Sequence, residues 1–118
     1  MAGNTDNKIM KTLVAVHKIL GIYDDCLDSD SLALERLNAK SLKISENRFS
    51  KIIIMLSEAG YISGVDVREF SDGSRSVDYS DSQITLDGLK YHAENSLFLK
   101  AAGFLPDLLS AGVSVIAG

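Results

Sequence analysis

The chain has 118 residues, of which 46% are apolar and 24% are charged, and its net charge is −4. This length predicts one domain, residues 1–118, and the composition excludes a disordered tail, a collagen-like chain and a disulfide-stapled miniprotein. The single cysteine excludes an intramolecular disulfide, and no apolar run is long enough to span a membrane. Because Met1–Lys11 is too polar for a signal peptide, we expect a cytoplasmic protein with no membrane partner.

The first half of the chain is patterned as three helices. An apolar stripe predicts a first helix over about residues 6–23, capped by one of residues 4–6 and ended by Gly21 or by the aspartates beyond it. A short helix is predicted around 32–38, and residues 40–44 are expected to form a connector. The third helix should begin after Ser45, a good N-cap, and end before Gly60. Its core face is formed by Phe49, Ile52, Ile53 and Leu56.

After Gly60 the hydrophobic period changes from that of a helix to that of a strand. Two strands, over about 61–70 and 77–84, are joined by an Asp-Gly turn at 71–74. Thr85 is the predicted N-cap of a fourth helix, whose core stripe is Leu86, Leu89, Ala93 and Leu97. This order predicts an α+β fold, a winged helix-turn-helix, with its core over about 7–103 and an apolar C-terminal helix or tail over 104–118.

Several stretches in this order resemble the YjcQ family, small proteins of Gram-positive bacteria and their prophages. The matching stretches are Asn7–Met10, Ile44–Phe49, Leu56–Ile62, Ile84–Tyr91 and Glu94–Ser96. The resemblance covers about residues 7–109 and implies a winged-helix protein with a prophage-associated role. It brings no established activity and no catalytic residues to carry over.

The residues that could carry catalysis or bind metal do not form a convincing site. His17 and His92 are expected to lie far apart on separate helices, and each lacks nearby ligands at metal-binding spacing. Cys26 lies among aspartates, whose negative charge disfavours a thiolate nucleophile. We therefore predict no metal, no cofactor and no enzymatic activity.

Double-stranded DNA is the first candidate partner, because the third helix of such a unit enters the major groove. The side chains predicted to contact bases and phosphates are Lys40, Lys43, Asn47, Arg48, Ser50, Lys51 and, near the tip of the wing, Arg75.

A protein partner is the alternative. Ile54 and Met55 place apolar groups on the predicted outer face of the third helix, and the wing carries five acidic residues against two basic ones. The apolar segment after Leu97 is expected to pack on the first helix near Ile9 and Leu13. Its exchange between two copies would instead give a homodimer through the C-terminal helix.

Overall fold

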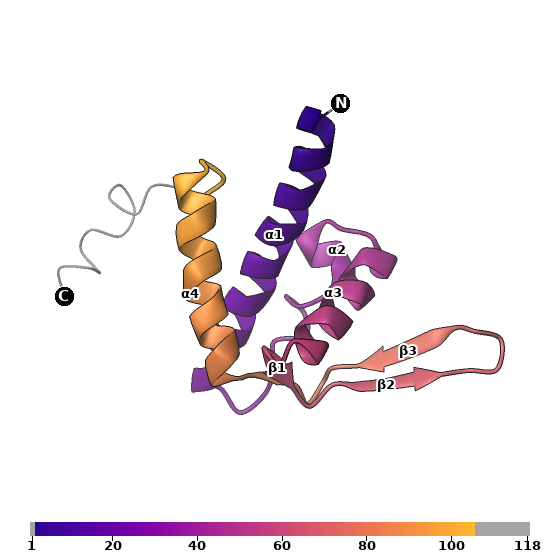
Figure 1. The fold of residues 1–118 in the computed structure, drawn as a ribbon. Helices are drawn as coiled ribbons and strands as arrows, with labels where there is room; N and C mark the ends of the chain where they lie inside the picture. Colours follow the sequence, from indigo (N-terminus) through magenta and orange to yellow (C-terminus); the bar gives the residue numbers. More distant parts are fainter. Residues whose placement is uncertain (1, 106–118) are drawn as a thin grey trace.

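The computed structural model describes the backbone of residues 2–105 and the side chains of residues 8–105. Four helices and two short antiparallel ladders follow one another along this part of the chain (Figure 1). The elements in order are α1 (Ala2–Asp25), the 3₁₀ turn η1 (Cys26–Asp28), α2 (Ala39–Leu42), α3 (Glu46–Glu58), β1 (Ile62–Ser63), β2 (Asp66–Glu69), β3 (Arg75–Asp78), β4 (Gln83–Ile84) and α4 (Leu86–Ala101). This arrangement is consistent with the predicted winged helix.

The core lies where α1 meets α3 and α4. Figure 1 shows α1 between α4 and the pair formed by α2 and α3. Ile19, Leu20 and Tyr23 of α1 are almost completely buried, together with Ile52 and Ile53 of α3. α1 is longer than predicted at both ends, so Gly21 and residues 4–6 lie inside the helix. Ile9, expected in the core, is instead about half exposed.

The predicted second helix is wrong in position. Residues 34–38 form turns, and α2 occupies 39–42, which we expected to be a connector. Asn38 decides this boundary, because its side chain accepts a hydrogen bond from the Ser41 amide (2.8 Å) and donates to the carbonyls of Leu34 and Glu35. A side chain that bonds its neighbouring backbone in this way favours a cap over a helix interior.

α3 forms as predicted. The Ser45 hydroxyl accepts a hydrogen bond from the Arg48 amide (3.0 Å), and the helix ends at Glu58, with Ala59 as its C-cap before Gly60, whose φ is 81°. The four predicted core side chains, Phe49, Ile52, Ile53 and Leu56, are all buried. Only glycine adopts this left-handed backbone without cost, so the chain turns sharply from α3 into β1.

The wing is a hairpin that is interrupted near its base. β2 pairs with β3 through the predicted turn at 71–74, while β1 pairs separately with β4. Gly64 lies between the two ladders with φ of 82°, and a Cβ there would approach the Asp81 carbonyl oxygen to 2.6 Å. The β2–β3 hairpin projects away from the helices in Figure 1, and no residue of these two strands is fully buried.

The N-cap of α4 is confirmed, but of its predicted core stripe only Leu89 packs, partly buried, against the core. Thr85 accepts from the Gly88 amide (3.0 Å), whereas Leu86 and Leu97 are 80% and 62% exposed. The buried residues of α4 are instead Gly88, Asn95 and Leu99. Gly88 lies so close to β1 that a Cβ would be 2.0 Å from the Tyr61 carbonyl oxygen, and the Asn95 amide donates to the Leu13 carbonyl (3.1 Å). These two contacts select the face that α4 turns to the core.

Among the described residues, no helix is long and apolar enough to cross a bilayer. Most of the predicted C-terminal tail, residues 106–118, lies outside the described part of the chain.

Candidate nucleic-acid interface

The outer face of α3 carries the polar side chains that the sequence singled out. The opposite face of the helix is held in the core by its four buried apolar residues. Asn47 and Lys51 are therefore exposed, one turn apart, and Ser50 is half-buried beside them. This is the face of α3 that is available to a partner.

A hollow of about 450 Å³ joins this face to the wing. It is lined by Asn47, Ser50, Lys51 and Ile54 of α3 and by Gly73, Ser74, Arg75 and Val77 of the hairpin. The structure thus places Arg75 on the same surface as Asn47, Ser50 and Lys51. The sequence assigned these four residues to one partner, but it could not predict where the hairpin lies relative to α3.

Arg48 lies on the flank of α3 that faces α1. Its guanidinium Nη1 donates a hydrogen bond to the hydroxyl of Thr12 on α1. The two residues line a second hollow, of about 360 Å³, together with Lys51 and Met55. Arg48 therefore connects α3 to α1 and does not line the hollow under the wing.

Lys40 and Lys43 lie immediately before α3. Lys40 is an exposed residue of α2, and Lys43 ends that helix in the left-handed region with φ of 60°. Lys43 therefore occupies the tight turn between α2 and α3, close to the N-terminal end of α3. Neither lysine forms an ion pair within residues 8–105.

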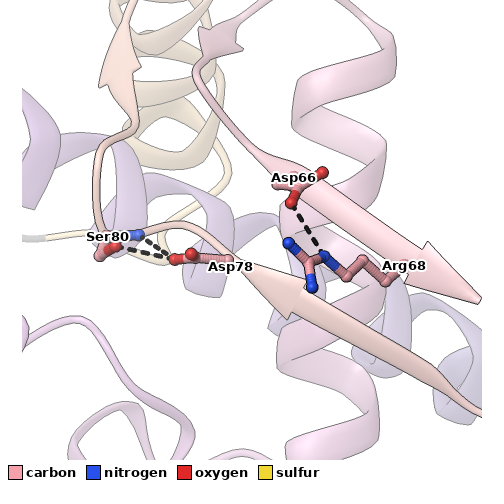
Figure 2. A network of polar contacts seen from close by, with 4 residues as sticks. All are labelled: Asp66, Arg68, Asp78 and Ser80. Atoms are coloured by element: carbon pink, nitrogen blue, oxygen red, sulfur yellow. Dashed lines mark hydrogen bonds and ion pairs between the residues drawn. The ribbon is translucent and has the colours of Figure 1, made fainter.

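The two arginines of the wing are engaged with acidic neighbours. The Arg75 Nη2 atom is 3.2 Å from a Glu69 carboxylate oxygen across the hairpin. The Arg68 Nε atom is 3.4 Å from an Asp66 oxygen, as Figure 2 shows. All four side chains are more than half exposed, so these ion pairs are weak and can exchange for other partners.

Two other wing carboxylates are held by serines. Asp78 accepts hydrogen bonds from the hydroxyl (2.7 Å) and the amide (3.1 Å) of Ser80 (Figure 2), and Asp72 accepts from Ser74 in the same way. These bonds lower the pKa of both carboxyl groups, so both are ionised at neutral pH. The wing therefore presents an acidic surface next to its basic residues.

The two apolar residues proposed for a protein partner differ in exposure. Ile54, expected on the outer face of α3, is half-buried because it lines the hollow under the wing. Met55 is 53% exposed and lies beside Arg48. Met55 is thus the accessible one of the pair.

Sequence reasoning missed a histidine pair. His17 of α1 and His92 of α4 were expected far apart, but their rings stack with centroids 5.0 Å apart. They are 75 positions apart in the sequence, so only the packing of α1 on α4 brings them together. Within the described residues, no three histidine, cysteine or acidic side chains form a group that could hold a metal ion.

Comparison with known protein families matches residues 17–105 to the family described as YjcQ protein. The matched region runs from the middle of α1 to the end of the described chain and includes α3, both ladders and α4. Comparison with the curated proteins and with the solved structures found no match.

Proposed function

Because the chain belongs to the YjcQ protein family, which is not a known enzyme family, we propose a binding function, with double-stranded DNA as the ligand. In this proposal α3 enters the major groove, and the β2–β3 hairpin contacts the adjacent backbone. The observation that carries the proposal is the shared hollow, which brings Asn47, Ser50 and Lys51 of α3 together with Arg75 of the wing.

The side chains of this surface suit both kinds of contact with DNA. Asn47 is exposed near the N-terminal end of α3, and an asparagine amide can bond an adenine edge with two hydrogen bonds. Lys51 and Arg75 can bind phosphates on either side of the groove, and Lys40 and Lys43 extend the basic surface before α3.

The acidic wing restricts how the protein can bind. Arg75 must leave Glu69, and the ionised Asp72 and Asp78 must remain away from phosphates. Both requirements weaken binding, so we expect modest affinity that depends strongly on salt.

The test is binding to a fluorescent mixed-sequence duplex, measured by anisotropy. With up to four phosphate contacts, we expect affinity to fall about 100-fold between roughly 50 and 200 mM salt. Lys51→Ala should weaken binding and reduce the slope of log affinity against log salt by about 1. Lys18→Ala removes the same charge from an exposed position on α1 and should change neither. Absence of binding at the lower salt would overturn the proposal.

A second candidate function, binding of a protein partner, is favoured by Met55 and the wing. Met55 is more than half exposed, as is Phe70, which adjoins the turn of the acidic wing. Exposed apolar side chains beside a charged rim are typical of protein interfaces.

A specific partner should be captured by the native protein and lost with Met55→Glu. Leu34→Glu introduces the same charge at an exposed apolar residue outside α3. It is the matched control and should leave capture unchanged. Equal capture by both variants would count against this surface.

A further inference from the structure

α4 carries an apolar stripe on the face turned away from the core. Leu86 and Leu97 are strongly exposed, and Ala93 between them is exposed as well. At about 100° per residue these three side chains fall within a sector of roughly 40°. The buried residues Gly88 and Asn95 lie on the opposite face. Leu86, Ala93 and Leu97 are called the outer stripe below.

The outer stripe is not covered by any described part of the chain. Exposing two leucines on one helix face is unfavourable, and such faces mark interaction surfaces. Figure 1 shows α4 at the edge of the molecule, with α1 on one side only. The wing and α3 lie beyond α1, so the outer stripe is separate from the surface proposed for DNA.

Two opposite charges border the outer stripe on the same side. Lys90 and Glu94 are both exposed, and neither forms an ion pair within residues 8–105. On a helix they lie roughly 40° apart, next to the line that joins Leu86 to Leu97. Along the helix axis, the positive and the negative side chain are about equally far from the middle of the stripe, near residue 92.

We propose that the outer stripe is the interface with a second copy of this chain, with the two α4 helices antiparallel. The charge pattern is self-complementary in this arrangement. A two-fold axis near residue 92 brings Lys90 of each copy opposite Glu94 of the other, and Leu86 of each copy near Leu97 of the other. In a parallel pair the charges of the two copies would instead fall on opposite edges of the interface, so Lys90 and Glu94 would not face one another. Ala93 lies close to the axis, where a small side chain lets the helices approach.

The dimer is expected to be weak. One helix of 16 residues from each copy contributes a small interface, which is typical of transient complexes. Sedimentation velocity from about 5 to 300 µM should show an average mass that rises with concentration from one chain towards two. These concentrations span the dissociation constants expected for such small interfaces.

Charge reversal tests the antiparallel register. Lys90→Glu and Glu94→Lys should each weaken self-association about fivefold, because each places like charges opposite one another twice. An equimolar mixture of the two variants should form a heterodimer within about twofold of the native affinity, since every facing pair is again opposite in sign.

Loss of the apolar contact tests the stripe itself. Leu97→Glu should weaken self-association at least about tenfold while leaving the melting temperature of the monomer unchanged, because the side chain is exposed. Leu27→Glu, at an exposed leucine of η1, is the control and should leave the dimer intact.

Three outcomes would overturn the proposal. The first is a monomer at every concentration, and the second is a mixture of the charge variants that associates no better than either alone. The third is a monomer destabilised by Leu97→Glu, which would indicate that another part of the same chain covers the outer stripe.

Discussion

His17 and His92 stack with their ring planes 28° apart, in the seam between α1 and α4. The Ser96 hydroxyl donates to the His92 carbonyl (2.7 Å), so its oxygen must accept the 3.0 Å hydrogen bond from His17 Nδ1. The neutral His17 ring therefore carries its proton on Nδ1. His92 Nδ1 is buried and has no hydrogen-bond partner among residues 8–105.

This pair should make the protein less stable in mild acid. Burial lowers the pKa of His17, and the neighbouring His92 and Lys18 lower it further. Burial also lowers the pKa of His92, although Asp24 and Asp25 oppose the shift. With both pKa values below the unfolded value of about 6.5, the unfolded chain binds more protons, so stability is full above that pH and falls below it.

Urea unfolding at pH 7.5 and 5.5 measures the effect. We expect a lower midpoint at pH 5.5, and a smaller difference in His17→Asn and His92→Phe. The asparagine amide can still donate to Ser96, and phenylalanine keeps the stacked ring without an unpartnered nitrogen. An unchanged pH dependence in both variants would show that the pair does not titrate on unfolding.

Tyr23 is linked to the start of β4 through one hydrogen bond. Its hydroxyl is 2.7 Å from Ser82 Oγ, and because Ser82 itself donates to the Tyr79 carbonyl, Tyr23 is the donor. Burial raises the pKa of Tyr23 to about 12. Tyr23→Phe should lower the free energy of unfolding by about 1–2 kcal/mol, since it leaves a buried acceptor with fewer bonds.

Ser82→Ala tests whether the stability lost in Tyr23→Phe comes from the hydrogen bond between Tyr23 and Ser82. If it does, the double variant should lose about 1 kcal/mol less unfolding free energy than the two single variants lose together. Additive losses would assign the cost of Tyr23→Phe to packing instead.

Two glycines inside helices should respond in opposite directions to alanine. Gly21 of α1 has space, because a Cβ there would be 3.8 Å from the nearest atom of His92. Gly21→Ala should therefore stabilise the protein by about 0.5–1 kcal/mol, because alanine lowers the conformational entropy of the unfolded chain and is favoured over glycine inside a helix. Gly88→Ala would meet the backbone of Tyr61 at 2.0 Å and should cost more than about 3 kcal/mol.

Thermal unfolding of the two variants checks this contrast. Equal melting temperatures would mean that α4 can move away from β1 without loss, contrary to the tight contact at Gly88.

Arg48 and Lys51 should differ in their effect on DNA binding, although both belong to α3. Lys51 lines the hollow under the wing, while the Arg48 guanidinium is bonded to Thr12. Arg48→Ala should therefore reduce DNA affinity less than Lys51→Ala, and should lower the free energy of unfolding by less than about 1 kcal/mol because the bond is exposed. A larger loss of affinity with Arg48→Ala would mean that this side chain leaves Thr12 to contact DNA.

The elements that could be predicted correctly are those whose signals are local. The Ser45 and Thr85 caps, the Gly60 turn and the Asp-Gly hairpin each depend on a few neighbouring residues, and α3 has one apolar stripe only. The polar residues of its outer face follow from that stripe, because burying one side of a helix exposes the other.

Local signals do not specify which faces of the helices pack together, and contacts between distant segments decide this. The apolar stripe of α4 formed by Leu86, Ala93 and Leu97 stays exposed, because the close approach of Gly88 to Tyr61 and the bond from Asn95 to Leu13 turn the opposite face to the core. The stacking of His17 on His92 likewise depends on how α1 and α4 pack. Periodicity specifies that a helix has an apolar face, but contacts between residues distant in the sequence determine which face reaches the core.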